Sequence, residues 1–81
     1  MKIAEEIQEK ARNLGINPFN TPFTPKDLGI TASNYGSFSD FCDNTKSSRW
    51  NSHVCLKAVE FNKGHRPTKY LLLPPSQWIV R

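Results

Sequence analysis

The sequence predicts an α+β fold in which three helices are followed by a β-hairpin. The chain has 81 residues, the length of one small domain whose hydrophobic core is limited in size. It opens with an apolar stripe at helical spacing, carries prolines and polar runs in its middle, and closes with two β-rich runs around a glycine. These three observations predict the order helix, short helix, helix and hairpin within a single domain, residues 1–81.

The first helix is expected over residues 2–14, "KIAEEIQEKARNL". Glutamates lie near its start, where the helix dipole favours negative charge. Gly15 follows, a residue type that readily adopts the left-handed conformation of a helix cap. Four apolar residues recur with the spacing of one helix face: Ile3, Ile7, Ala11 and Leu14.

A second, short helix is expected to begin in the segment "TPKDL", residues 24–28. Thr24 can cap it, Pro25 suits the first helical position, and Asp27 places a carboxylate near the free N–H groups. Gly29 is expected to end this helix after little more than one turn.

A third helix is expected within residues 31–45, capped by either Thr31 or Ser37, and it covers residues 37–45 if Ser37 is the cap. Ser37 is followed three residues later by Asp40, an arrangement similar to a capping box. A second interpretation runs the helix through residues 48–58, although the β-branched and aromatic residues from Leu56 on favour a strand there. In the first interpretation three residues have the i, i+3, i+4 spacing of a buried helix face: Phe38, Phe41 and Cys42.

Residues 56–62 and 68–73 are expected to form a β-hairpin around the turn "KGHRP". Gly64 is expected to supply the positive φ of this turn, and Pro67 closes it. The tail, residues 74–81, carries enough apolar surface that we expect it to pack on the body of the domain or on a partner: Trp78, Ile79 and Val80.

Positive charge is concentrated in the second half of the chain. Residues 1–45 contain four Lys/Arg and six Asp/Glu, a balance of −2, and residues 46–81 contain seven and one, a balance of +6. Together they give the net charge of +4. Such a distribution predicts one basic face that binds a polyanion. The alternative is that the additional lysines only favour solubility.

Several classes of function are not expected. The longest apolar run, Leu71–Pro75, is far shorter than the roughly 20 residues of a membrane helix. The acidic start "MKIAEEIQEK" does not resemble a secretion signal, so a cytoplasmic location is expected. Cys42 and Cys55 form no C-x-x-C pair and match no zinc spacing with the histidines, so no metal or cofactor is expected. No catalytic motif is evident, so neither an enzyme nor a small-molecule substrate is expected.

The order of elements, the segment "FTPKDLGI" before a turn and the G-x-x-P-x-x-Y pattern at Gly64, Pro67 and Tyr70 together resemble the winged-helix superfamily of helix-turn-helix DNA-binding domains. The resemblance covers about residues 3–73. It implies a winged helix-turn-helix fold whose hairpin is the wing. It also implies a module that binds duplex DNA, such as a small transcriptional regulator.

In a domain of this kind the tip of the wing would grip phosphates and the third helix would read bases. The polar cluster after that helix, "NTKSSRWN", is better equipped than the helix, and Arg49 and Asn51 become base readers if the helix runs through it. The candidate nucleic-acid-binding residues are Ser37, Ser39, Asn44, Lys46, Ser48, Arg49 and Asn51 around the third helix, and Lys63, His65, Arg66 and Lys69 in the wing.

Two other kinds of partner are alternatives. The same fold could be a protein-interaction module without nucleic-acid binding, with Trp50 and Trp78 contacting a second copy or another protein. RNA ranks below both partners, because the sequence does not indicate the surface aromatic platform that RNA-binding domains use.

Overall fold

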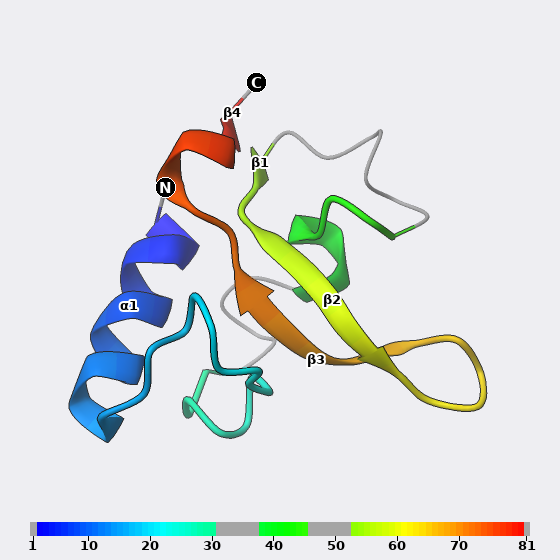
Figure 1. Ribbon diagram of the computed structural model, residues 1–81, viewed down its shortest axis with the longest axis horizontal. Helices are drawn as coiled ribbons and strands as arrows, with labels where there is room; N and C mark the ends of the chain where they lie inside the picture. Colours follow the sequence, from blue (N-terminus) through cyan, green and yellow to red (C-terminus); the bar gives the residue numbers. More distant parts are fainter. Residues whose placement is uncertain (1, 31–37, 46–52, 81) are drawn as a thin grey trace.

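The structure is a computed structural model that describes residues 2–30, 38–45 and 53–80. The strands form two small antiparallel sheets, β2 with β3 and β1 with β4. In chain order the elements are helix α1 (Lys2–Leu14), the 3₁₀ helix η1 (Phe38–Phe41), strands β1 (His53–Val54), β2 (Leu56–Phe61) and β3 (Pro67–Leu72), the 3₁₀ helix η3 (Pro75–Gln77) and strand β4 (Ile79–Val80) (Figure 1).

Helix α1 forms where the apolar stripe predicted it, and it ends in a left-handed glycine cap. Gly15 has a φ of 73° and donates its N–H to the carbonyl of Arg12, while Ile16 donates to the carbonyl of Ala11 at 2.8 Å. These two bonds satisfy carbonyls that the helix end would otherwise leave free. Leu14 departs from the predicted stripe, because it is 55% exposed. The helix buries Ile3, Ala4, Ile7 and Ala11.

The second predicted helix is wrong, because residues 25–29 form a turn. The capping residues act as expected: Thr24 and Asp27 each donate their N–H to the other's side chain at 3.0 Å. The turn then closes at once. Gly29 adopts a φ of 68°, and the N–H of the next residue donates to the carbonyl of Pro25 at 3.0 Å. A left-handed residue so close to the cap ends the helix before it can continue.

The third predicted helix is also wrong. Of residues 38–45, which the structure describes, only Phe38–Phe41 are helical, as the 3₁₀ helix η1. The chain after it runs beside β2, where Cys42 pairs with Leu56 in a parallel bridge. The N–H of Asp43 donates to the carbonyl of Leu56 at 3.0 Å. The outer edge of β2 therefore forms hydrogen bonds with backbone groups that would have been paired within a helix. The alternative helix through residues 48–58 is wrong as well, because β1 and β2 occupy its second half.

The predicted hairpin is confirmed. Strands β2 and β3 are antiparallel, and their register pairs Leu56 with Leu72 and Ala58 with Tyr70. All four residues are buried, as expected when alternate residues of a strand face the core. Beyond Ala58 the register shifts twice before the loop.

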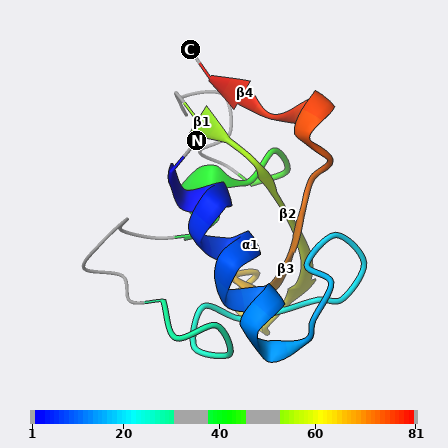
Figure 2. The same ribbon diagram turned by 90° about the vertical axis from the view of Figure 1, so that its left-hand side faces the viewer.

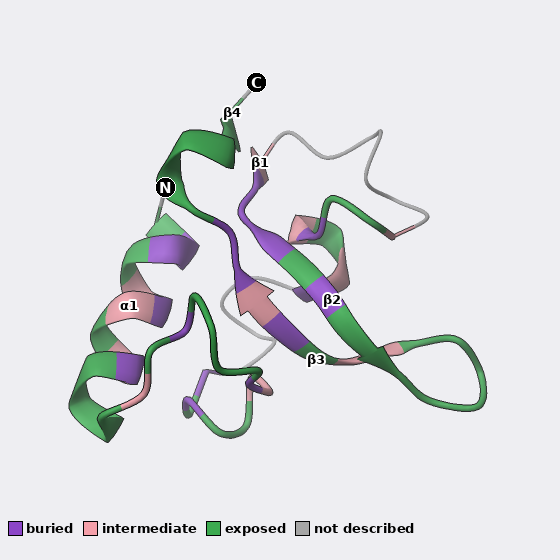
Figure 3. Ribbon diagram, viewed as in Figure 1, coloured by how far each residue is buried: buried purple, intermediate pink, exposed green. Residues whose placement is uncertain are grey.

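The winged helix-turn-helix prediction is therefore wrong for this chain. Among the described residues α1 is the only α-helix, and no helix-turn-helix precedes the hairpin. The architecture is a small α+β fold in which α1 lies beside the β2–β3 hairpin (Figures 1 and 2). Figure 3 shows that the buried residues of α1 lie on the side of the helix that faces the strands.

Tyr70 of β3 packs against Phe23 and Phe38 and so joins the segments that carry them to the core. Its ring contacts Phe38 edge-to-face with the centroids 5.5 Å apart, and Phe23 with the centroids 6.5 Å apart. Phe23 also exchanges two backbone hydrogen bonds of 2.9 Å with Tyr70. The second edge of β3 is therefore paired, which removes a site of unwanted strand association.

The tail packs on the body of the domain. The indole N–H of Trp78 donates to the carbonyl of Leu73 at 2.7 Å, and its ring packs against the core. Strand β4 pairs with β1, so that Val80 lies opposite His53.

Candidate nucleic-acid interface

The loop between β2 and β3 is held in one conformation by Asn62. Its carbonyl accepts the N–H of His65, and its own N–H donates to the carbonyl of Arg66, both at 3.0 Å. Its side-chain Oδ1 accepts two further N–H groups, those of Gly64 at 2.8 Å and Arg66 at 3.1 Å. Asparagine favours tight turns through such local bonds. The loop is therefore an ordered tip that projects from the hairpin (Figure 1).

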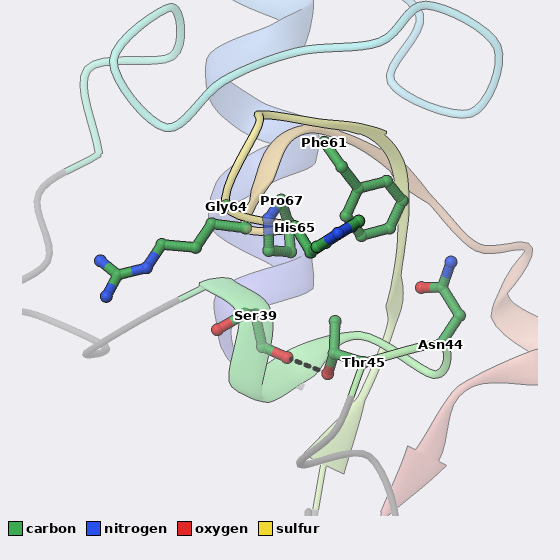
Figure 4. A pocket seen from close by; sticks show the side chains of 8 residues that line it. Ser39, Asn44, Thr45, Phe61, Gly64, His65 and Pro67 are labelled. Atoms are coloured by element: carbon green, nitrogen blue, oxygen red, sulfur yellow. Dashed lines mark hydrogen bonds between the residues drawn. The ribbon is translucent and has the colours of Figure 1, made fainter.

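His65, and not Gly64, has the positive φ of this loop, 60°. The prediction that Gly64 supplies it is wrong. A left-handed backbone costs a residue with a Cβ about 1–2 kcal/mol relative to its usual conformations. The exposed ring of His65 lies on the hairpin side of the neighbouring hollow (Figure 4).

The hairpin carries positive charge that one acid offsets only in part. Residues 56–72 contain four Lys/Arg and one Glu, a balance of +3, and Lys63 and Arg66 are exposed. Lys69 lies 3.7 Å from Glu60, with side-chain exposures of 46% and 57%. A surface pair of this kind contributes about 0–1 kcal/mol, so an anionic ligand can compete for Lys69.

A hollow of about 410 Å³ lies between the hairpin loop and residues 39–45. It brings together two groups of predicted residues that are distant in the sequence, those of the wing and those of the third helix. Figure 4 shows Phe61, His65 and Pro67 on the hairpin side, and Ser39, Asn44 and Thr45 on the other. The complete lining is Ser39, Asn44, Thr45, Phe61, Gly64, His65, Arg66 and Pro67.

The side of the hollow opposite the hairpin loop is fixed by its own hydrogen bonds. The Asn44 amide donates to the carbonyl of Ala58 at 2.8 Å and accepts its N–H at 2.9 Å, so this side chain pairs with the edge of β2 as a strand would. The hydroxyl of Thr45 donates to the carbonyl of Ser39 at 2.8 Å (Figure 4). The amide that the sequence suggested as a nucleic-acid contact therefore also holds the fold.

Sequence reasoning misses Phe61, which lines the hollow and is 46% exposed. The expectation that the chain lacks an aromatic surface is thereby weakened. A signal was present in "LKAVEFN": Leu56 and Ala58 alternate as buried residues of a strand, and Phe61 is out of phase with them. An apolar residue out of phase in a strand points away from the core.

The predicted site residues divide into two groups. The described ones in the hollow are Ser39, Asn44, His65 and Arg66, and Lys63 and Lys69 belong to the same hairpin. Those that lie outside the described residues are Ser37, Lys46, Ser48, Arg49 and Asn51, together with the predicted protein contact Trp50.

The two cysteines are buried free thiols. Burial raises the pKa of each to about 12, and the negative charge of Asp43 contributes at Cys42. Such thiols stay protonated and unreactive at neutral pH. In the described part of the chain, no three His, Cys, Asp or Glu side chains are grouped so that they could hold a metal ion. No helix in that part has the length and apolar character needed to cross a membrane.

Comparisons with protein-family models, with curated proteins and with solved structures find no match for this chain. The chemistry of the loop and of the hollow is therefore the basis on which a function can be assigned.

Proposed function

We propose that this protein binds nucleic acid through the basic loop of the β2–β3 hairpin. The proposed partner is a polyanion, because the hairpin of residues 56–72 has a balance of +3 and its loop projects from the molecule (Figure 1). Nucleic acids present phosphates at regular spacing, and Lys and Arg side chains bind them by displacing counterions. The proposal does not include a recognition helix of the kind that winged-helix regulators insert into DNA.

The observation that carries the proposal is the ordering of the loop by Asn62. Four hydrogen bonds to this one residue hold the backbone from which Lys63, His65 and Arg66 project. A loop that is already ordered loses less conformational entropy when it binds. Contacts from such a loop to phosphates supply affinity and orientation without reading sequence directly.

The cellular setting that we propose is the cytoplasm. The free thiols of Cys42 and Cys55 are the form that cysteines keep in a reducing compartment.

The salt dependence of binding tests the proposal. With about three phosphate contacts, from Lys63, Arg66 and Lys69, affinity for a labelled oligonucleotide should fall about 15- to 60-fold between about 50 and 200 mM salt. Fluorescence anisotropy measures this directly. Replacing Lys63→Gln together with Arg66→Gln should weaken binding at low salt and reduce the slope of log affinity against log salt by about 2.

A matched control removes the same charge elsewhere. Lys2→Gln with Arg12→Gln changes two exposed cations on α1, which lies on the other side of the molecule from the loop (Figure 1). This variant should keep the wild-type slope. Equal losses in both double variants would show that only net charge matters. An absence of binding even at low salt would refute the proposal and favour a protein partner, for which the exposed Ile79 and Val80 of β4 are the candidate contacts.

A further inference from the structure

The exposed ring of Phe61 sits beside the cationic loop. Phe61 is the last residue of β2 and pairs across the hairpin with Pro67, and both line the hollow. An aromatic side chain left 46% exposed keeps a large apolar surface in water. A flat aromatic ligand would cover that surface.

Charge is unevenly divided between the two sides of this hollow. The hairpin side contributes Arg66 and the exposed His65, whereas the lining residues of the opposite side are uncharged. That opposite segment also carries two exposed carboxylates just outside the lining, Asp40 and Asp43. A nucleotide would therefore bind with its phosphate toward Arg66 and its uncharged base between Phe61 and the side formed by Ser39, Asn44 and Thr45.

The size and the exposure of the hollow select the form of nucleic acid. A volume of about 410 Å³ is in the range of sites that hold one small ligand, so it suits a single nucleotide. In a duplex both faces of each base are stacked, and exposing one face requires the base to leave the helix at a cost of a few kcal/mol. Unpaired bases need no such step.

We infer that the hollow receives one unpaired base of a single-stranded nucleic acid, stacked on Phe61, while Arg66 and Lys63 contact the adjoining phosphates. This inference rests on the nucleic-acid binding proposed above and names the form of its ligand. Stacking on an aromatic ring accepts any base, because every base has an aromatic face. The protein would therefore prefer single strands to duplexes but discriminate little between sequences.

The test compares a labelled single-stranded oligonucleotide with the duplex of the same sequence, using the full chain. Wild type should bind the single strand more tightly. Phe61→Ala should weaken single-strand binding about 5- to 100-fold and change duplex binding by less than about 2-fold. Val59→Ala is the matched control, because Val59 lies on the same strand with a similar exposure of 38%. It should leave both affinities unchanged.

Two further variants and an NMR measurement keep the test independent of folding. Phe61→Leu keeps an apolar side chain without the ring and should lose single-strand affinity as Phe61→Ala does. Phe61→Trp should retain it. In NMR spectra of the wild type, the ring protons of Phe61 should shift upfield when the single strand is added, as they do when a base stacks above them.

The outcomes separate this inference from the proposed function. If Phe61→Ala binds the single strand as wild type does, while binding remains salt-dependent and sensitive to Lys63→Gln with Arg66→Gln, base stacking is refuted and phosphate binding stands. If the wild type binds the duplex more tightly than the single strand, base stacking is likewise refuted and phosphate binding stands. If neither probe binds at low salt, both proposals fail.

Discussion

At the scale of single residues, the hairpin loop places a histidine where the backbone favours glycine. His65 has a φ of 60° although Gly64 is its direct neighbour. Strained backbone of this kind persists only where the surrounding bonds enforce it, and Asn62 provides them by bonding to residues on both sides of the strained position. The arrangement directs an exposed imidazole to the rim of the hollow instead of minimising strain.

We therefore predict that His65→Gly stabilises the protein by about 0.5–1 kcal/mol, because relief of the left-handed strain exceeds the greater entropy of glycine in the unfolded chain. Urea unfolding at equilibrium measures the change. Lys63→Gly, at a position of the same loop without positive φ, should instead lower the free energy of unfolding. If both substitutions lower the free energy of unfolding by similar amounts, the backbone at residue 65 is not strained.

At the scale of elements, the outer edge of β2 organises the chain that precedes it. Leu56 bonds to the backbone of Asp43, and Ala58 bonds twice to the Asn44 side chain, 14 residues earlier. The segment after η1 thus pairs with the edge of β2 in two ways. Asp43 bonds through its backbone, and Asn44 bonds through its side-chain amide. This contact also places Ser39, Asn44 and Thr45 opposite the hairpin loop.

Asn44→Ala should destabilise the protein by about 1–3 kcal/mol, because it leaves the N–H and carbonyl of Ala58 without their partner. The free energy of unfolding in urea reports the loss. The control is Asn20→Ala, whose side chain accepts the hydroxyl of Thr21 in an exposed turn and whose loss should cost about 0.5 kcal/mol or less. If Asn44→Ala is equally mild, the amide does not hold the edge of β2.

These edge contacts explain which elements could be predicted from the sequence. The stripe of α1 and the hairpin are local patterns, so they specify their elements without information from the rest of the chain. The spacing of Phe38, Phe41 and Cys42 fits one 3₁₀ turn followed by an extended residue as well as it fits a helix. The choice between them is made by β2, which a local pattern cannot include.

The candidate site divides in the same way. The basic loop is contiguous in sequence, so its charge could be recognised directly. The hollow depends on the approach of residues 39–45 to the loop, a property of the tertiary structure that composition and spacing do not determine. The exposure of Phe61, in contrast, follows from its phase relative to Leu56 and Ala58 in β2 and could be predicted.

At the scale of the whole molecule, charge and core are segregated. Residues 2–30, which contain α1, have four Lys/Arg and four Asp/Glu, whereas residues 56–72 have a balance of +3. The core lies between them and includes both cysteines, each with 0% exposure. Cys42 follows η1 and Cys55 precedes β2, so their protonation reports on whether water reaches this part of the core.

We predict that the protein loses stability in alkaline solution through these thiols. Burial raises the pKa of Cys42 and Cys55 from 9.0 to about 12 in the folded protein. Well below pH 9.0 both states keep their protons, so the thiols leave stability unchanged there. Between about 9 and 12 only the unfolded chain releases them, and the free energy of unfolding falls by up to about 1.4 kcal/mol per pH unit for each thiol.

Tyr70 adds to this loss above its ordinary pKa of 10.0, because burial raises its pKa as well. Urea unfolding at about pH 8 and about pH 10.5 measures the total, and the double variant Cys42→Ala with Cys55→Ala isolates the contribution of the thiols. The variant should be less stable than wild type at the lower pH, because two buried side chains are shortened, but its stability should fall less between the two values. An equal fall in both proteins would mean that the thiols ionise as easily in the folded state as in the unfolded chain, and that the core around η1 and β2 admits water.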